Sequence, residues 1–185
     1  IKKQLFFFFV NQAQQIELGK PKTFTESSNL MVANNFVFNK WREALGGRIR
    51  AIICGSAPLQ PKLASIFTNT GIPILERYGL TKCAPVVSVV PFREKDFRAG
   101  SVGKLLPSVQ VKIEEDGEIL IKGPNVMLGY YKNEEETKKV FNEDGWLLTG
   151  DIGEFTPDGF LKITDRKKEL FKTSGGKYVA PAPIE

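Results

Sequence analysis

The stretch RIRAIICGSAPLQPKLASIFTNTGIPILERYGLT, residues 48–81, decides the fold class of this chain. It opens with a short apolar run of strand length, continues with a helical pattern over residues 61–69 that Gly71 closes, and reaches a second apolar run at residues 72–75. A strand, a helix and a strand within about 30 residues form a βαβ unit. Such units have parallel strands and a right-handed crossover, so the sequence predicts an α/β fold.

Two loops follow these two predicted strands. The first contains Gly55, Ser56, Ala57 and Pro58, and the second spans residues 78–81. Ligands of parallel sheets bind beyond the carboxyl ends of the strands, and both loops lie at such ends. We therefore expect the two loops on the same rim of the sheet, as part of a binding site.

The flanking segments predict different structure. Residues 1–18 and 35–45 have helical patterns separated by a loop at residues 19–22, and a Gly-Gly pair ends the second pattern. After residue 85 the apolar positions alternate, and Asp-Gly pairs at 116–117 and 158–159 predict two hairpins. Asn133 is a candidate cap for a short helix. We therefore expect the βαβ unit to be followed by a β-rich subdomain.

Composition excludes several classes of chemistry. The chain of 185 residues is 42% hydrophobic and 25% charged, which is typical of a soluble globular protein. It has no histidine, so Ser-His and Cys-His nucleophile pairs and His-ligated metals are excluded. Two cysteines, Cys54 and Cys83, are too few for a disulfide framework. The apolar run at residues 5–10 is far shorter than the ~20 residues of a membrane span, and it predicts a buried helix.

The net charge of +5 is mild, and its densest basic cluster lies near the end of the chain. This cluster consists of Arg166, Lys167, Lys168, Lys172 and Lys177. A nucleic-acid site would interleave such a patch with stacking aromatic side chains, whereas here Glu169 interrupts it and two glycines follow. The cluster indicates a charged, flexible crossing, and we expect no nucleic-acid partner.

Some polar residues could meet a ligand. Beside Tyr78 and Gly79, the Thr81 hydroxyl could hold a phosphate while the aromatic ring stacks on a base; the alternative is a strand-ending turn. Asp151 could accept from the two hydroxyls of a diol, or it could bond its own backbone in a turn. Arg166 offers a planar fork for a phosphate or a diol, or it is an exposed arginine at a hairpin end.

The order of five motifs goes beyond these single residues. GSAP at 55–58 is followed by YGLT at 78–81, GPNVMLGYY at 123–131, TGD at 149–151, and DRKKE at 165–169 with SGG at 174–176. This order resembles the adenylate-forming superfamily over essentially the whole chain. Within it, residues 165–185 look most like AMP-forming long-chain fatty acyl-CoA synthetases.

The resemblance implies a two-step reaction. A fatty-acid carboxylate attacks the α-phosphate of ATP to give acyl-AMP and pyrophosphate, and coenzyme A then takes the acyl group as a thioester. The implied ligands are therefore ATP or AMP, Mg²⁺, a fatty acid and coenzyme A. Gly55, Ser56, Ala57 and Pro58 would line the adenine and acyl pocket.

The resemblance assigns the remaining contacts one by one. Tyr78, with Gly79, would lie against adenine, and Thr81 would contact the α-phosphate. Asp151 would hold the ribose hydroxyls, and Arg166 would reach the ribose and phosphate side. Lys168 falls where the small C-terminal domain rotates between the two steps, a hinge movement absorbed by a few backbone torsions.

The implied domain organisation has three parts. Residues 1–164 would be the last portion of the large N-terminal domain, residues 165–172 the hinge, and residues 173–185 the start of the small C-terminal domain. The phosphate loop expected upstream and the lysine expected late in the C-terminal domain are absent, so we expect residues 1–185 alone not to catalyse adenylation. We expect a cytoplasmic protein, and leave peripheral membrane association and oligomeric state open.

Two other functions fit the same residues. One is an adenylation domain that loads a carrier-protein thiol, which the thiol acceptor of the complete protein would reveal. The other is a non-catalytic nucleotide- or acyl-binding homologue. A basic interaction module is more remote, and a salt-titrated nucleic-acid binding assay would detect it.

Lys82 is the main departure from the family pattern. The family usually has glutamate directly after the threonine of the Tyr-Gly-x-Thr motif, where it ligates magnesium, and a lysine ammonium would repel that cation. We therefore predict that Lys82→Glu in the full-length protein increases magnesium-dependent adenylation, measured as ATP-pyrophosphate exchange. An unchanged rate would contradict the interpretation of Lys82 as a defect.

Overall fold

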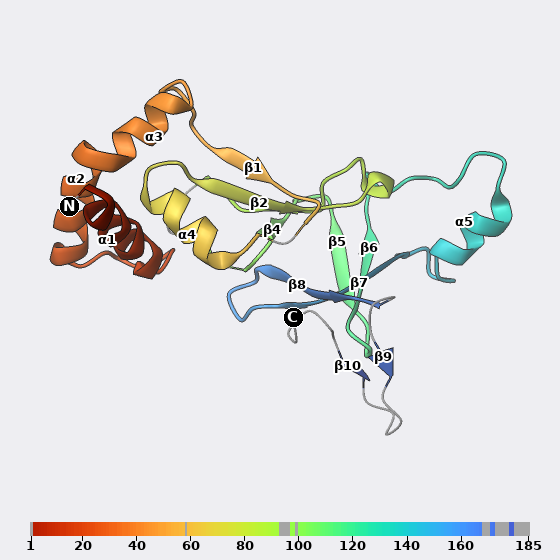
Figure 1. Ribbon diagram of the computed structural model, residues 1–185. Helices are drawn as coiled ribbons and strands as arrows, with labels where there is room; N and C mark the ends of the chain where they lie inside the picture. The colour runs from red at the N-terminus through yellow and green to blue at the C-terminus, as the bar shows by residue number, and fades with distance from the viewer. Residues whose placement is uncertain are drawn as a thin grey trace. The chain divides into compact units, whose positions relative to one another are not determined.

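The computed structural model describes residues 2–57, 59–92, 97–98, 100–167, 171–172 and 178–179. The chain divides into two compact units (Figure 1). The first comprises Ile1–Arg77 and Val90–Gly103, and the second comprises Tyr78–Val89 and Lys104–Glu185. The α/β class predicted from the sequence is confirmed.

The first unit opens with helices, and the second helical segment starts earlier than predicted. The elements are α1 (Lys2–Gln15), α2 (Phe24–Ala33), the π-helix η1 (Asn34–Phe38) and α3 (Asn39–Ala44). A capping box begins α2, because Thr23 Oγ1 accepts from Glu26 N at 3.2 Å and Glu26 Oε2 accepts from Thr23 N at 2.6 Å. This cap moves the start of the segment from the expected residue 35 to residue 24.

The early apolar run is buried on one side only. Phe9 and Ala13 of α1 pack with Ala33, Val37 and Phe38 in a fully apolar cluster. Phe7 and Phe8 are each 51% exposed, so the prediction of a buried helix is correct for one face of α1 and wrong for the other. Among the described residues, no helix combines the length and apolar character that crossing a membrane requires.

The predicted βαβ unit is present. It consists of β1 (Ile52–Cys54), α4 (Pro61–Asn69) and β2 (Ile74–Tyr78), and the two strands lie side by side in Figure 1. They are parallel, with Ile52 opposite Ile74 and Cys54 opposite Glu76. A second apolar cluster, which includes Ala64 of α4 and Leu75 of β2, joins the helix to the strands. The carboxyl ends of both strands therefore lie at the same edge, as the sequence predicts.

In the second unit, short elements follow β2 that the sequence did not predict. They are the 3₁₀ helix η2 (Thr81–Cys83), β3 (Ser88–Val89) and β4 (Lys104–Leu105), the last two paired antiparallel. Asn125 Nδ2 donates to the carbonyls of Cys83 and Val86, at 2.9 Å each. Tertiary hydrogen bonds thus fix a segment whose own sequence has no regular period.

Both hairpins are confirmed in a four-stranded antiparallel sheet of order β5-β6-β7-β8. Its strands are β5 (Gln110–Ile113), β6 (Glu118–Lys122), β7 (Leu147–Phe155) and β8 (Leu161–Arg166). The predicted cap of α5 (Glu134–Val140) is also present, because Asn133 Oδ1 accepts from Glu136 N at 3.1 Å. Further along, β9 (Phe171–Lys172) and β10 (Tyr178–Val179) pair antiparallel.

Glu76 on β2 gives the first unit a pH dependence. Burial raises the pKa of the Glu76 carboxyl group to about 7, and a hydrogen bond from the backbone of Leu59 to this group opposes the rise. The folded-state pKa lies above the usual 4.5, so the folded state binds this proton more tightly than the unfolded chain. The stability that the neutral carboxyl supports is present below pH 4.5 and is lost as the pH rises through about 7.

We predict that Glu76→Gln removes this loss, since glutamine stays neutral. Urea unfolding between pH 4 and pH 8 measures it, and the variant should be more stable than the wild type at pH 8. Glu43→Gln is the control, because Glu43 is exposed. Parallel pH profiles for the wild type and Glu76→Gln would contradict the prediction.

Candidate active site

Asp151 lies at the centre of the predicted site and is only 6% exposed. Its Oδ2 accepts from the Tyr78 hydroxyl at 2.7 Å, and its Oδ1 accepts from Arg166 Nε at 3.2 Å. A carboxylate removed from water is costly unless it is paired and hydrogen-bonded. The structure therefore brings together three residues that the sequence selected separately, from positions up to 88 residues apart.

An irregularity in β7 aims the Asp151 side chain. Between the pairs Leu120 with Leu148 and Glu118 with Ile152, β6 advances by two residues and β7 by four. Gly150 takes φ +75° inside this bulge, a left-handed conformation that glycine adopts without steric cost. Bulges redirect side chains next to active sites. The motif, for which a turn was one of two alternatives from the sequence, is thus a bulge within one continuous strand.

Local hydrogen bonds hold the bulge. The Thr149 hydroxyl donates to the carbonyl of Ile119 at 2.7 Å and accepts from Asp151 N at 3.0 Å. The backbone of Asp151 is thereby fixed to β6, in addition to the contacts of its carboxylate. On β8, Arg166 lies opposite Asp151 in the strand register, which places its guanidinium beside the carboxylate.

Gly79 is required by a close approach of the backbone. A Cβ atom at this position would lie 1.7 Å from the carbonyl oxygen of Pro85, where no side chain fits. The chain returns so tightly because Val87 N donates to Tyr78 O at 2.9 Å. Burial, and then the Asp151 carboxylate, raise the pKa of the Tyr78 hydroxyl, so this group remains a hydrogen-bond donor at neutral pH.

Thr81 and Lys82 follow in η2. The Thr81 side chain is exposed, and Lys82 is half-buried. The carbonyl of Lys82 accepts from Met127 N at 2.8 Å, which joins η2 to the motif at residues 123–131. Thr81 is therefore exposed to a ligand, while the backbone that carries it is held in place by a tertiary hydrogen bond.

The first predicted loop belongs to the other unit. A Cβ at Gly55 would lie 2.9 Å from Arg77 Cγ, and Ser56 takes φ +72°, so this loop is tightly constrained. Ala57 is the next residue of this loop after Ser56, and Pro58 lies outside the described residues. Lys168, the predicted pivot, also lies outside them.

The side chain at position 82 does not fit a magnesium ion. Among the residues that the structure describes, no group of three or more His, Cys, Asp or Glu side chains gathers to hold a metal ion. Lys82 places a cation where the family pattern has its ligand.

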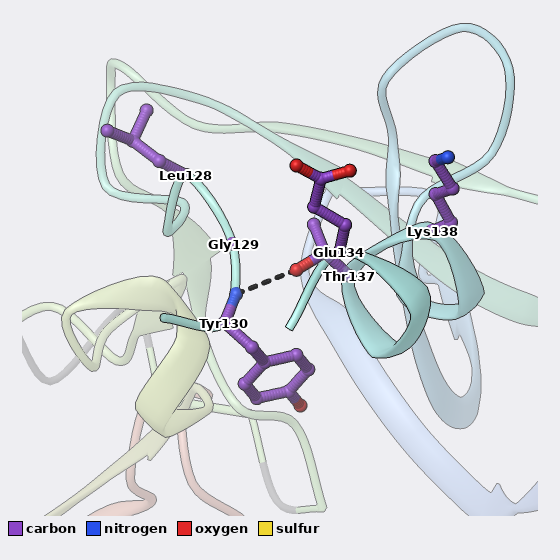
Figure 2. A pocket seen from close by; sticks show the side chains of 6 residues that line it. All are labelled: Leu128, Gly129, Tyr130, Glu134, Thr137 and Lys138. Atoms are coloured by element: carbon purple, nitrogen blue, oxygen red, sulfur yellow. Dashed lines mark hydrogen bonds between the residues drawn. The ribbon is translucent and has the colours of Figure 1, made fainter. Parts of the chain in front are cut away.

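A cavity of about 380 Å³ lies beside α5 (Figure 2). It is lined by Leu128, Gly129, Tyr130, Glu134, Thr137 and Lys138. Tyr130 N donates to Thr137 Oγ1 at 2.8 Å, and a Cβ at Gly129 would lie 2.7 Å from Thr137 Cγ2. The second half of the motif at 123–131 is thus clipped onto α5. None of the Tyr78, Asp151 and Arg166 side chains lines this cavity.

The sequence did not single out Glu118. Glu118 is 7% exposed and contacts both Gly150 and Lys167, the neighbours of Asp151 and Arg166. A signal existed, because Glu118 begins the otherwise apolar run EIL at residues 118–120. An acid inside a strand that is buried on both faces needs a partner.

Comparison with known proteins identifies the class. A family model described as AMP-binding enzyme matches residues 12–131. The ATP-bound crystal structure of MatB from Rhodopseudomonas palustris superposes with a TM-score of 0.64 at 36% identity, over 75% of this chain and 29% of that one. The chain belongs to the family of AMP-binding enzymes, which confirms the resemblance in the motif order.

Two curated relatives are more specific. The long-chain-fatty-acid–CoA ligase FadD15 of Mycobacterium bovis is 44% identical over 154 residues, which are 83% of this chain and 25% of the relative. The peroxisomal long chain acyl-CoA synthetase 6 of Arabidopsis thaliana is 41% identical over 201 aligned positions, covering 100% of this chain and 27% of the relative. The chain spans about a quarter of the length of these relatives.

The Tyr78 hydroxyl tests the architecture of this site. Tyr78→Phe leaves one oxygen of a buried carboxylate without its donor, so we predict a loss of about 1–3 kcal/mol in the free energy of unfolding. Urea denaturation measures it. Tyr131→Phe is the matched control, because Tyr131 is exposed and should tolerate the change. Equal free energies of unfolding for the two variants would show that the Tyr78–Asp151 hydrogen bond does not contribute to stability.

Proposed function

We propose that the whole protein is an AMP-forming fatty-acid–CoA ligase. In the first step, a fatty-acid carboxylate oxygen attacks the α-phosphorus of ATP and pyrophosphate leaves, which gives acyl-AMP. In the second, the sulfur of coenzyme A attacks the acyl carbonyl and AMP leaves, while the thiol proton is released. The grouping of Tyr78, Asp151 and Arg166 is the observation that carries the proposal. The names of the curated relatives support the choice of a fatty acid as substrate.

The chain's own residues fit a nucleotide in three ways. Among the described residues, each Asp151 oxygen has one protein donor, and a carboxylate offers about four lone-pair sites, so it can still accept from ribose hydroxyls. Arg166 is 65% exposed at its side chain and uses Nε for Asp151, so the outer edge of its guanidinium faces solvent. The exposed Thr81 hydroxyl is suited to an α-phosphate oxygen.

The preorganisation of these groups is their contribution to rate. Asp151 and Arg166 neutralise each other before a ligand arrives, so neither has to be desolvated alone during binding. Groups already fixed in a site of low dielectric stabilise developing charge without reorganising. On this proposal, Lys82 would face the phosphates and offset part of their negative charge.

The domain organisation remains part of the proposal. Residues 1–164 would belong to the large N-terminal domain, residues 165–172 to the hinge with Lys168 as pivot, and residues 173–185 to the small C-terminal domain. Coenzyme A and magnesium would bind in the whole protein. Cytoplasmic location stays a prediction.

A second function is favoured by one observation, the lysine at position 82. A homologue that binds nucleotide or acyl groups without turnover would keep Asp151 and Arg166 while losing the acid that holds the metal. Such a protein would bind AMP and yet form no acyl-AMP. Transfer to a carrier-protein thiol differs only in the acceptor, so a comparison of acceptors in the same assay separates it.

Asp151 provides the test of the proposed function. The purified whole protein is given a long-chain fatty acid, ATP and coenzyme A, and mass spectrometry follows acyl-CoA and AMP. We expect Asp151→Asn to raise the KM for ATP by ~10-fold or more, since the ribose loses a charged acceptor. Asp158→Asn is the control, because Asp158 lies in the hairpin turn after β7. Absence of ATP-dependent acyl-CoA from the wild type would refute the ligase assignment.

A further inference from the structure

Glu118 connects two parts of the candidate site. Its Oε1 accepts from the backbone N–H of Gly150 at 2.9 Å, and its Oε2 accepts from Lys167 Nζ at 2.6 Å. Gly150 precedes Asp151, and Lys167 follows Arg166. One carboxylate on β6 therefore holds the immediate neighbours of both members of the Asp151–Arg166 pair.

Asp116 reinforces the second contact. Its Oδ2 lies 2.6 Å from the same Lys167 ammonium, so two acids from the β5–β6 hairpin bind one lysine. The hydrogen bonds that Lys167 donates to Asp116 and Glu118 raise the pKa of Lys167, and the lysine in turn lowers the pKa of Asp116. Lys167 and Asp116 are thus charged at neutral pH, and the lysine ammonium is shared between the Asp116 and Glu118 side chains.

The two acids that contact Lys167 differ in burial. Glu118 has only 9% of its side chain exposed, whereas the side chains of Lys167 and Asp116 are 45% and 47% exposed. An acid this deeply buried is costly without partners, so its two oxygens hold their donors firmly. The exposed contact of Asp116 is screened by water and contributes less. Glu118 is therefore the dominant member of the cluster.

The contacts also fix where β8 ends. Arg166 is the last residue of β8, and Lys167 is tied to the β5–β6 hairpin directly after it. Backbone torsions before this tie cannot rotate freely without breaking two ion pairs. A movement of the following segment would accordingly begin beyond Lys167.

We propose that Glu118 is a positioning residue with two linked tasks. Through Gly150 it stabilises the bulge that orients Asp151. Through Lys167 it holds the first part of the proposed hinge, residues 165–172, between the two domains. The second task rests on the proposed function, because it requires the domain rotation, whereas the first rests on hydrogen bonds within the second unit alone.

Three substitutions separate the tasks. In Glu118→Gln, the amide oxygen still accepts from Gly150, but the ionic contact to Lys167 is lost. In Glu118→Leu, both contacts are lost. Lys167→Met removes only the contact of Glu118 with the proposed hinge. The control is Lys162→Met, because Lys162 lies on β8, five residues before Lys167, and its pair with Glu154, at 3.8 Å, is exposed.

Amide hydrogen exchange, measured on the whole protein, tests directly whether the contacts of Lys167 with Glu118 and Asp116 hold the hinge, and it requires no catalysis. We expect Lys167→Met to speed amide exchange in residues 163–172 by ~10-fold or more, and Lys162→Met to leave it unchanged. Only Glu118→Leu should speed exchange in residues 148–152. If exchange at residues 163–172 in Lys167→Met matches the wild type, the proposed tie is refuted.

Separate assays of the two half-reactions read the functional consequence. We expect Glu118→Leu to raise the KM for ATP by ~10-fold, with Glu118→Gln within about twofold of the wild type. Lys167→Met should slow transfer from preformed acyl-AMP to coenzyme A by ~10-fold, while ATP-pyrophosphate exchange changes by less than about threefold. Equal loss in both half-reactions would mark the cluster as merely stabilising and overturn the positioning role.

The two proposals fail in different ways. A wild-type protein that forms no acyl-AMP refutes the proposed function, and the exchange measurements still decide whether Glu118 holds both segments. An active wild type whose variants show neither faster exchange nor separated half-reactions refutes the positioning role and leaves the ligase assignment standing.

Discussion

The second unit depends on a constraint that two buried carboxylates impose. Asp151 and Glu118 are each more than nine-tenths removed from solvent, and each needs charged or polar donors to be tolerated there. Asp151 takes the Tyr78 hydroxyl and Arg166, while Glu118 takes Gly150 N–H and Lys167. Because these donors come from separate segments, satisfying the two acids brings the loop after β2, the bulge in β7 and the end of β8 together.

This arrangement relates stability to function through the same atoms. The interactions that make Asp151 tolerable also hold it in the orientation that a diol requires, and its backbone is fixed by the Thr149 hydroxyl. A site of this kind is rigid before the ligand arrives, and such rigidity is the basis of electrostatic preorganisation. Lys82 in η2 places a positive charge where the family pattern has a metal-ligating acid, which distinguishes this chain from that pattern.

Local signals predicted most elements well where the period was clear. The βαβ unit, the two hairpins and the cap at Asn133 follow from apolar spacing and turn residues, and all are present. The start of α2 was missed although Thr23 and Glu26 have the spacing of a capping box. β3 and β4 were missed because each has two residues, too few for a period, and they form through pairing with each other.

The sequence by itself determined the class of this protein, since the five motifs and their order are properties of the linear chain. It also selected Tyr78, Asp151 and Arg166 as site residues. Only the tertiary structure decided that these three touch, that the Thr-Gly-Asp motif is a bulge within a strand, and that Glu118 supports it. The physical reason is that the partners of a buried charge are set by strand register and burial. Both arise from pairings between segments that are distant in the chain, 15 residues apart for Asp151 with Arg166 and 30 or more for Glu118 with Gly150 and Lys167.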